Sequence, residues 1–112
     1  MNITLVRGDT LAFGVLIENN TQPLDAAFFS AKKDKDDEAY ILQASIGDGI
    51  ELAETGENST TYRVRVSPEK TERVTPGNYY YDLQIQQNGD VFTVLMGTLV
   101  VLNDITRGGG AS

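Results

Sequence analysis

Apolar and polar residues alternate along most of this chain with a period of two, which is the pattern of strands that bury one face. Between residues 10 and 18, the side chains of Leu11, Phe13, Val15 and Ile17 share one face. The segment at 60–67 alternates as regularly. The same period predicts further strands over the first residues and over 26–33, 40–46, 50–53, 78–85 and 90–102.

Turn-forming residues separate these segments. Asn88 and Gly89 form the dipeptide typical of a two-residue hairpin turn. The charged run at 34–38 is expected at a solvated hairpin tip. Gly97, inside the last strand, indicates a bulge or a bend there.

Helical signals are confined to one place, where Ser67 and Pro68 predict the N-cap and first residue of a single helical turn. Seven or eight short strands at a spacing of roughly 8–12 residues are typical of a sandwich or barrel. We therefore expect an all-β fold, an antiparallel Ig-like β-sandwich, in a single domain over residues 1–106. The Gly-rich residues 107–112 are predicted to be a flexible tail.

Two residue types that are common in active sites are missing, because the 112 residues include neither Cys nor His. The chain therefore lacks a thiolate nucleophile, thiolate metal ligands and the commonest general base. The alternating acids Asp34, Asp36 and Glu38 resemble part of a cation site, but Ala39 and Ser45 stand where an EF-hand needs Gly and Glu. We expect no catalytic residues, no cofactor and no metal, and no enzymatic activity.

The charge of the chain argues against nucleic acid as a partner. The net charge is −7, and an acidic field repels phosphate backbones. No apolar run approaches the roughly 18 residues of a membrane helix, so no membrane contact is expected. No secretory signal precedes the first strand, which predicts synthesis and retention in a cytoplasm. The tripeptide Arg7-Gly8-Asp9 matches the integrin-recognition motif, but without export it is interpreted as a turn between the first two strands.

A run of three tyrosines gives the candidate interface. Tyr79 and Tyr81 are predicted to point into the core, and the Tyr79 hydroxyl to bond back to the backbone of the preceding corner, as in Ig-like sandwiches. Tyr80 then points outward, beside polar residues of the same strand. An exposed Tyr on a polar sheet face is a plausible contact residue, although lone surface aromatics are also common. The candidate interface residues are Tyr80, Asp82, Gln84, Arg63 and Arg65.

Several segments, taken in order, resemble a family of viral structural proteins. They read LVRGDTLAF at 5–13, PGNYYYDLQ at 76–84, GDVFTVL at 89–95 and GTLVV at 97–101. This series resembles small tail-associated structural proteins of bacteriophages and prophages, and is similar in particular to the N-terminal Ig-like domain of phage baseplate upper proteins. The resemblance extends from Leu5 to about Thr106.

The resemblance implies a non-enzymatic virion structural or assembly protein, located in the virion and assembled in the cytoplasm of the bacterial host. Its partners would be other virion proteins, with a homo-oligomer as a further expectation. Upper baseplate proteins continue into longer assembly segments, whereas this sequence stops after a Gly-rich tail, so a stand-alone accessory protein is expected. The alternative is an Ig-like carbohydrate- or surface-binding module of a bacterial extracellular protein.

Overall fold

A computed structural model describes residues 2–34, 36 and 39–104. The predicted tail at 107–112 and part of the predicted hairpin tip, at 35 and 37–38, lie outside the described residues. The elements follow the chain in the order β1 (Asn2–Val6), β2 (Leu11–Glu18), β3 (Ala26–Lys32), β4 (Leu42–Ile46), β5 (Gly49–Thr55), β6 (Ser59–Val66), α1 (Pro68–Thr71), β7 (Gly77–Gln87) and β8 (Asp90–Leu102).

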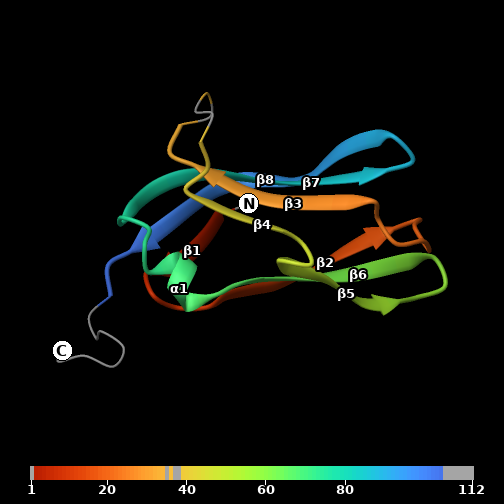
Figure 1. Cartoon of the computed structure of the whole chain (residues 1–112), viewed down its shortest axis with the longest axis horizontal. Coiled ribbons are helices and arrows are strands. Elements are labelled where there is room, and N and C mark those ends of the chain that lie inside the picture. The colour runs from red at the N-terminus through yellow and green to blue at the C-terminus, as the bar shows by residue number, and fades with distance from the viewer. Residues whose placement is uncertain (1, 35, 37–38, 105–112) are drawn as a thin grey trace.

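The eight strands form one mixed sheet that is nearly closed into a barrel. Their order in the sheet is β1-β8-β7-β3-β4-β5-β6-β2. The sheet curls so that β8, β7 and β3 lie above β2, β6 and β5 (Figure 1). The strand β4 connects these two layers in the sheet order, and the apolar faces of the layers meet between them. No helix within the described residues is long and apolar enough to cross a membrane.

The all-β prediction is confirmed, but the sheet is not antiparallel throughout. β1 pairs parallel to β8, from Asn2 opposite Thr98 to Val6 opposite Leu102. β4 and β5 also pair in parallel, over two positions. Alternation along a strand specifies which side chains share a face, but it carries no information about the neighbouring strand or its direction. The expectation of a purely antiparallel arrangement is therefore wrong for these two pairs.

A tight corner joins β4 to β5 and carries the chain from one layer toward the other. Gly49 has a φ of +104°, a conformation that favours glycine. A Cβ atom added to Gly49 would lie 2.8 Å from the Arg65 carbonyl oxygen and 2.9 Å from the Ala44 Cβ. The corner therefore requires both the backbone freedom and the small size of glycine.

The core between the layers is centred on Phe29 of β3, whose side chain is fully buried. Its ring packs edge-on against Phe13 of the facing layer, with the centroids 5.4 Å apart, and against Tyr81 of β7 at 5.6 Å. Aromatic pairs at such distances add to the stabilisation from burial. Phe28, the neighbour of Phe29, points to the opposite face, as alternation requires.

The β7–β8 hairpin turns at Asn88 and Gly89, as predicted. Both residues have positive φ, 54° and 83°, as a type I′ turn requires. The bulge in β8 lies elsewhere than expected: the register shifts between Leu83 and Gln84 of β7, which leaves Val94 as the extra residue. Gly97, where a bulge or bend was predicted, pairs regularly with Tyr81.

The predicted helical turn is present as α1, which packs against the turn between β1 and β2. Ser67 occupies the N-cap position with Pro68 following it, although the Ser67 side chain makes no capping hydrogen bond. The hydroxyl of the fully buried Thr71 donates to the Asp9 carbonyl oxygen at 2.7 Å. This bond fixes α1 against the segment that leads into β2.

Candidate binding face

The outward side of β7 carries four polar or amphipathic residues, Tyr80, Asp82, Gln84 and Gln86, because they alternate with the buried ones. The register places β3 on one side of β7 and β8 on the other. Side chains of β3, β4, β7 and β8 together line an open groove of about 640 Å³. We refer to this surface, with its groove, as the binding face.

Two exposed tyrosines lie beside a lysine at one end of the binding face. Tyr80 is 44% exposed and sits directly opposite Lys32 of β3. The Lys32 ammonium lies 4.9 Å from the ring centroid of Tyr40, which is in the segment before β4. An ammonium over an aromatic ring is held by the ring's negative face. The arrangement fixes one tyrosine of the groove and leaves both partly accessible to a partner.

Asp82 is the one acidic residue among the described residues that line the groove. It lies between Ser30 of β3 and Met96 of β8 in the register. Burial raises the pKa of the Asp82 carboxyl above its ordinary value, and the Lys32 ammonium partly offsets this rise. The Asp82 carboxyl is therefore partly removed from water within the groove.

Amide and thioether groups complete the lining. Gln43 of β4 donates a hydrogen bond from its Nε2 to the Ser30 hydroxyl at 3.2 Å, while Gln84 and Gln86 also line the groove. Met96 is 63% exposed. Exposed Tyr and Met side chains among amides offer apolar contact area together with donors and acceptors. The binding face therefore combines apolar contact area with hydrogen-bonding groups.

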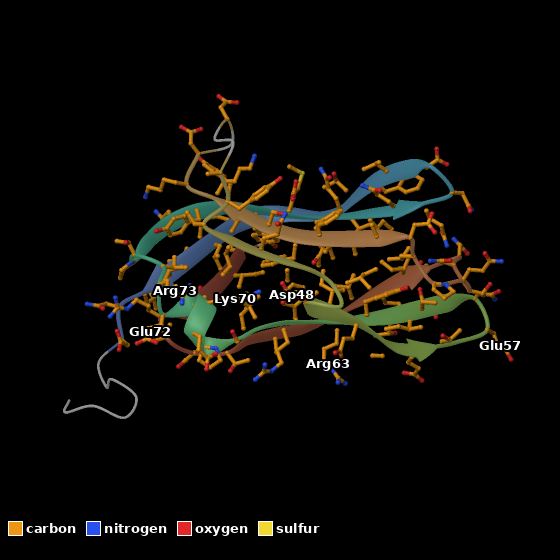
Figure 2. The ribbon with its side chains drawn as sticks, viewed as in Figure 1. Asp48, Glu57, Arg63, Lys70, Glu72 and Arg73 are labelled. Atoms are coloured by element: carbon orange, nitrogen blue, oxygen red, sulfur yellow. The ribbon has the colours of Figure 1, made fainter. Side chains whose placement is uncertain are left out.

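The structure divides the predicted interface residues between two surfaces. Tyr80, Asp82 and Gln84 lie together on the binding face. Arg63 and Arg65 lie on β6, in the other layer, and Figure 2 shows Arg63 below that layer and pointing away from the molecule. The five residues therefore do not form one site, because alternation places a residue on an outward face without specifying which layer that face belongs to.

Sequence reasoning missed the residues that other strands bring to the binding face. Tyr40, Gln43 and Met96 reach the groove from the segment before β4, from β4 and from β8, respectively. Phe28 carried a usable signal, since two adjacent Phe residues in one strand must point to opposite faces. No comparable signal marks the other three, because their position depends on the strand order.

Two further predictions about local structure are confirmed. The Tyr79 hydroxyl donates to the Thr75 carbonyl oxygen, and both Tyr79 and Tyr81 are buried. The segment Arg7-Gly8-Asp9 forms a turn in which Gly8 has a φ of +89°. Its arginine is occupied within the chain, in a salt bridge of 3.2 Å to Asp104.

Carboxylates do not converge on a common point in the part of the chain that the structure describes, where no group of three or more could hold a metal ion. Of the predicted acidic run, Glu38 lies outside the described residues. No protein-family model and no curated protein matches this sequence. We therefore infer the function from the resemblance of the motifs and from the surfaces described above.

Proposed function

We propose that this protein is a non-enzymatic structural or assembly protein of a bacteriophage or prophage tail, which contacts other virion proteins through its binding face. The ordered series of strand and turn motifs supports the class of protein. The main observation that supports contact with virion proteins is the groove of the binding face. There, Tyr80, Tyr40 and Met96 are exposed among amide side chains. Tyr and Met are enriched at protein interfaces.

We also propose that the fold is a variant of the Ig-like sandwich. Two facing layers and the bond from the Tyr79 hydroxyl to the Thr75 carbonyl, which resembles a tyrosine corner, support this relationship. The variant differs in its two parallel pairs, β1–β8 and β4–β5. Assembly would take place in the host cytoplasm and leave the protein in the virion.

Co-expression with the proteins encoded beside its gene tests this proposal. We expect the tagged chain to co-purify with a tail or baseplate protein, and Tyr80→Ala to weaken that complex about tenfold, as is usual for an aromatic at an interface centre. Ile46→Ala is the matched control, because Ile46 is also an exposed apolar residue but does not line the groove. Equal binding by both variants would exclude the binding face as the contact.

The second candidate function is carbohydrate or surface binding by an extracellular module, and the same groove favours it. Open grooves with exposed Tyr rings and amide side chains can stack against sugar rings and hydrogen-bond their hydroxyls. A glycan array separates the two candidates. Specific glycan binding that is lost in Tyr80→Ala, without any complex with virion proteins, would favour this second function.

A further inference from the structure

The two edges of the curled sheet remain open along a seam. Among the described residues, β2 pairs only with β6, so the far edge of Leu11–Glu18 has no neighbouring strand. β1 covers β8 only from Thr98 to Leu102. Side chains of β1, β2 and β8 line an apolar groove of about 790 Å³ between these edges. Unpaired backbone groups along an apolar strand are a template for pairing with another chain.

Apart from Glu18 at its end, the edge of β2 lacks the features that usually prevent such pairing. It contains neither Pro nor Lys, and its register with β6 is continuous over eight positions without a bulge. Its outward face even exposes a large aliphatic side chain, Leu16, at 56%. Charged residues, prolines and bulges are the common means of protecting an edge. β2 is therefore built as a strand that accepts a neighbour.

Gly14, in the middle of β2, supports close approach of a second backbone. Its φ is not in the left-handed region, and an added Cβ would meet only ordinary contacts, the nearest being the Tyr62 carbonyl oxygen at 3.9 Å. Neither backbone conformation nor packing inside the chain therefore requires glycine here. Glycine in a strand interior often marks a place where another backbone or a ligand approaches closely.

Two arginines flank the small residues of this edge. On the outward face, Arg65 lies opposite Ala12 and Arg63 opposite Gly14. Both are exposed, and neither forms a salt bridge with another described residue. Because Ala12 and Gly14 are small, the long arginine side chains can reach across β2 toward a strand added at its edge. The edge therefore favours an occupant with an acidic residue beyond Ala12.

We propose that this occupant is β2 of a second copy of the chain, paired antiparallel about a twofold axis at Val15. This register pairs Phe13 with Ile17 and Gly14 with Leu16 of the second copy. It also pairs Ala12 with Glu18 of the second copy. Arg65 then lies two strand spacings, about 9.6 Å between backbones, from that Glu18. The twofold symmetry produces this charge pair twice, and the contact is isologous.

The strands β1 and β8 of the other layer also fit this twofold arrangement. β1 lies at the end of the seam where β2 begins, because only the turn at 7–10 connects them. The start of β8 lies at the opposite end, where the Gln87 amide donates to the Asn20 Oδ1 just beyond β2. A twofold axis at Val15 exchanges these ends. It brings β1 of one copy opposite the uncovered part of β8 of the other, so the same contact extends over both layers.

Light scattering of the purified chain over a concentration series tests the dimer. We expect a mass of twice 12.2 kDa. Glu18→Arg or Arg65→Glu alone should raise the dissociation constant about tenfold, since each changes two charge pairs. The combined Glu18→Arg/Arg65→Glu variant should restore it. Leu16→Lys should abolish the dimer, whereas Ile46→Lys, on the central strand β4, should leave it intact.

A chain that stays monomeric up to about 1 mM would overturn the proposal. A dimer that Leu16→Lys leaves unchanged would also overturn it, as would a Glu18→Arg/Arg65→Glu variant that fails to restore the affinity. The proposal would likewise fail if the chain stayed monomeric and accepted only a foreign strand at β2. The restored double variant guards against effects of misfolding. The β2 edge is separate from the binding face, and this test needs no virion protein. Failure of the dimer and failure of the proposed virion contact are therefore distinguishable.

Discussion

Gly14 and Gly49 show how differently the same residue type can be constrained in one sheet. Gly49 has a φ of +104°, and an added Cβ would meet the Arg65 carbonyl oxygen at 2.8 Å. Gly14 has neither constraint within the chain. Gly49 is therefore needed for folding. Gly14 can be replaced without preventing folding, but a side chain there would hinder a strand that pairs with β2.

Alanine at these two positions should change stability in opposite directions. Gly49→Ala combines an unfavourable φ with a steric clash and should lower the free energy of unfolding by about 3 kcal/mol. Gly14→Ala restricts the unfolded chain and should raise it by about 0.5 kcal/mol at concentrations where the chain is monomeric. Urea denaturation of both variants is the measurement. A tolerated Gly49→Ala would contradict the described corner between β4 and β5.

Asp82 provides a pH-dependent test of the binding face. Burial raises the pKa of its carboxyl in the folded state. A raised folded pKa means that the stabilisation associated with protonation is present below the ordinary carboxyl pKa, and is lost as the pH rises through the folded value. Asp82→Asn should therefore be more stable than the parent chain at pH 7, with the difference disappearing toward about pH 3. Melting temperatures across this range are the measurement. If the charge of Asp82 stabilised the fold, Asp82→Asn would instead be less stable than the parent chain at pH 7.

At the scale of the elements, two tyrosine hydroxyls attach connecting segments to strands. Tyr62 of β6 accepts a hydrogen bond from the Leu24 backbone N–H at 2.8 Å, in a buried setting. Tyr79 of β7 donates to the carbonyl oxygen of Thr75, an exposed residue. Removing the first hydroxyl leaves a buried donor without a partner, whereas water can replace the second.

Replacement of each tyrosine by phenylalanine should separate these cases. Tyr62→Phe should cost about 2 kcal/mol, because the Leu24 N–H loses its acceptor in a buried environment. Tyr79→Phe should cost about 1 kcal/mol, which corresponds to a decrease of about 4 °C in Tm. Thermal unfolding of the two variants measures both losses in the free energy of unfolding, and each variant keeps its aromatic ring. Equal costs for the two changes would show that burial of the partner does not determine the loss.

The elements also show how far the sequence predicts this structure. Alternation around Phe13, Val64 and Tyr81 identifies strands and their buried faces, because a half-buried strand must repeat every two residues. The Asn88-Gly89 dipeptide identifies its hairpin for an equally local reason, the positive φ of both residues. Local chemistry determines both features, so they can be predicted from a short window of sequence.

At the scale of the whole molecule, such prediction fails where contacts are long-range. The β1–β8 pair joins the two ends of the described chain, and no local pattern indicates that the pair is parallel. The same limit applies to the binding face. The outward direction of Tyr80 is predictable from the alternation along β7, but the positions of Met96 and Tyr40 on this face are not. It also explains why the prediction assigns Arg63 and Arg65 to the wrong surface. Their outward direction is correct, but their layer depends on the strand order.

We propose that the binding face and the edge of β2 serve assembly together. The binding face lies on the outward side of β7 and its neighbours, while the open edge of β2 belongs to the other layer. A dimer through β2 would leave both binding faces accessible, since neither groove shares a residue with the other. Such a dimer would present two binding faces to a repeating structure, and paired binding raises avidity.

We propose that this protein is a component of a virion, and the composition of purified particles tests this proposal. Particles obtained from a bacterium that carries the gene should be washed at high salt and analysed by quantitative mass spectrometry. The account predicts that peptides of this chain remain with the particles in fixed stoichiometry to a tail protein. Particles that are complete and infectious without the chain, while the free protein binds a glycan, would contradict it.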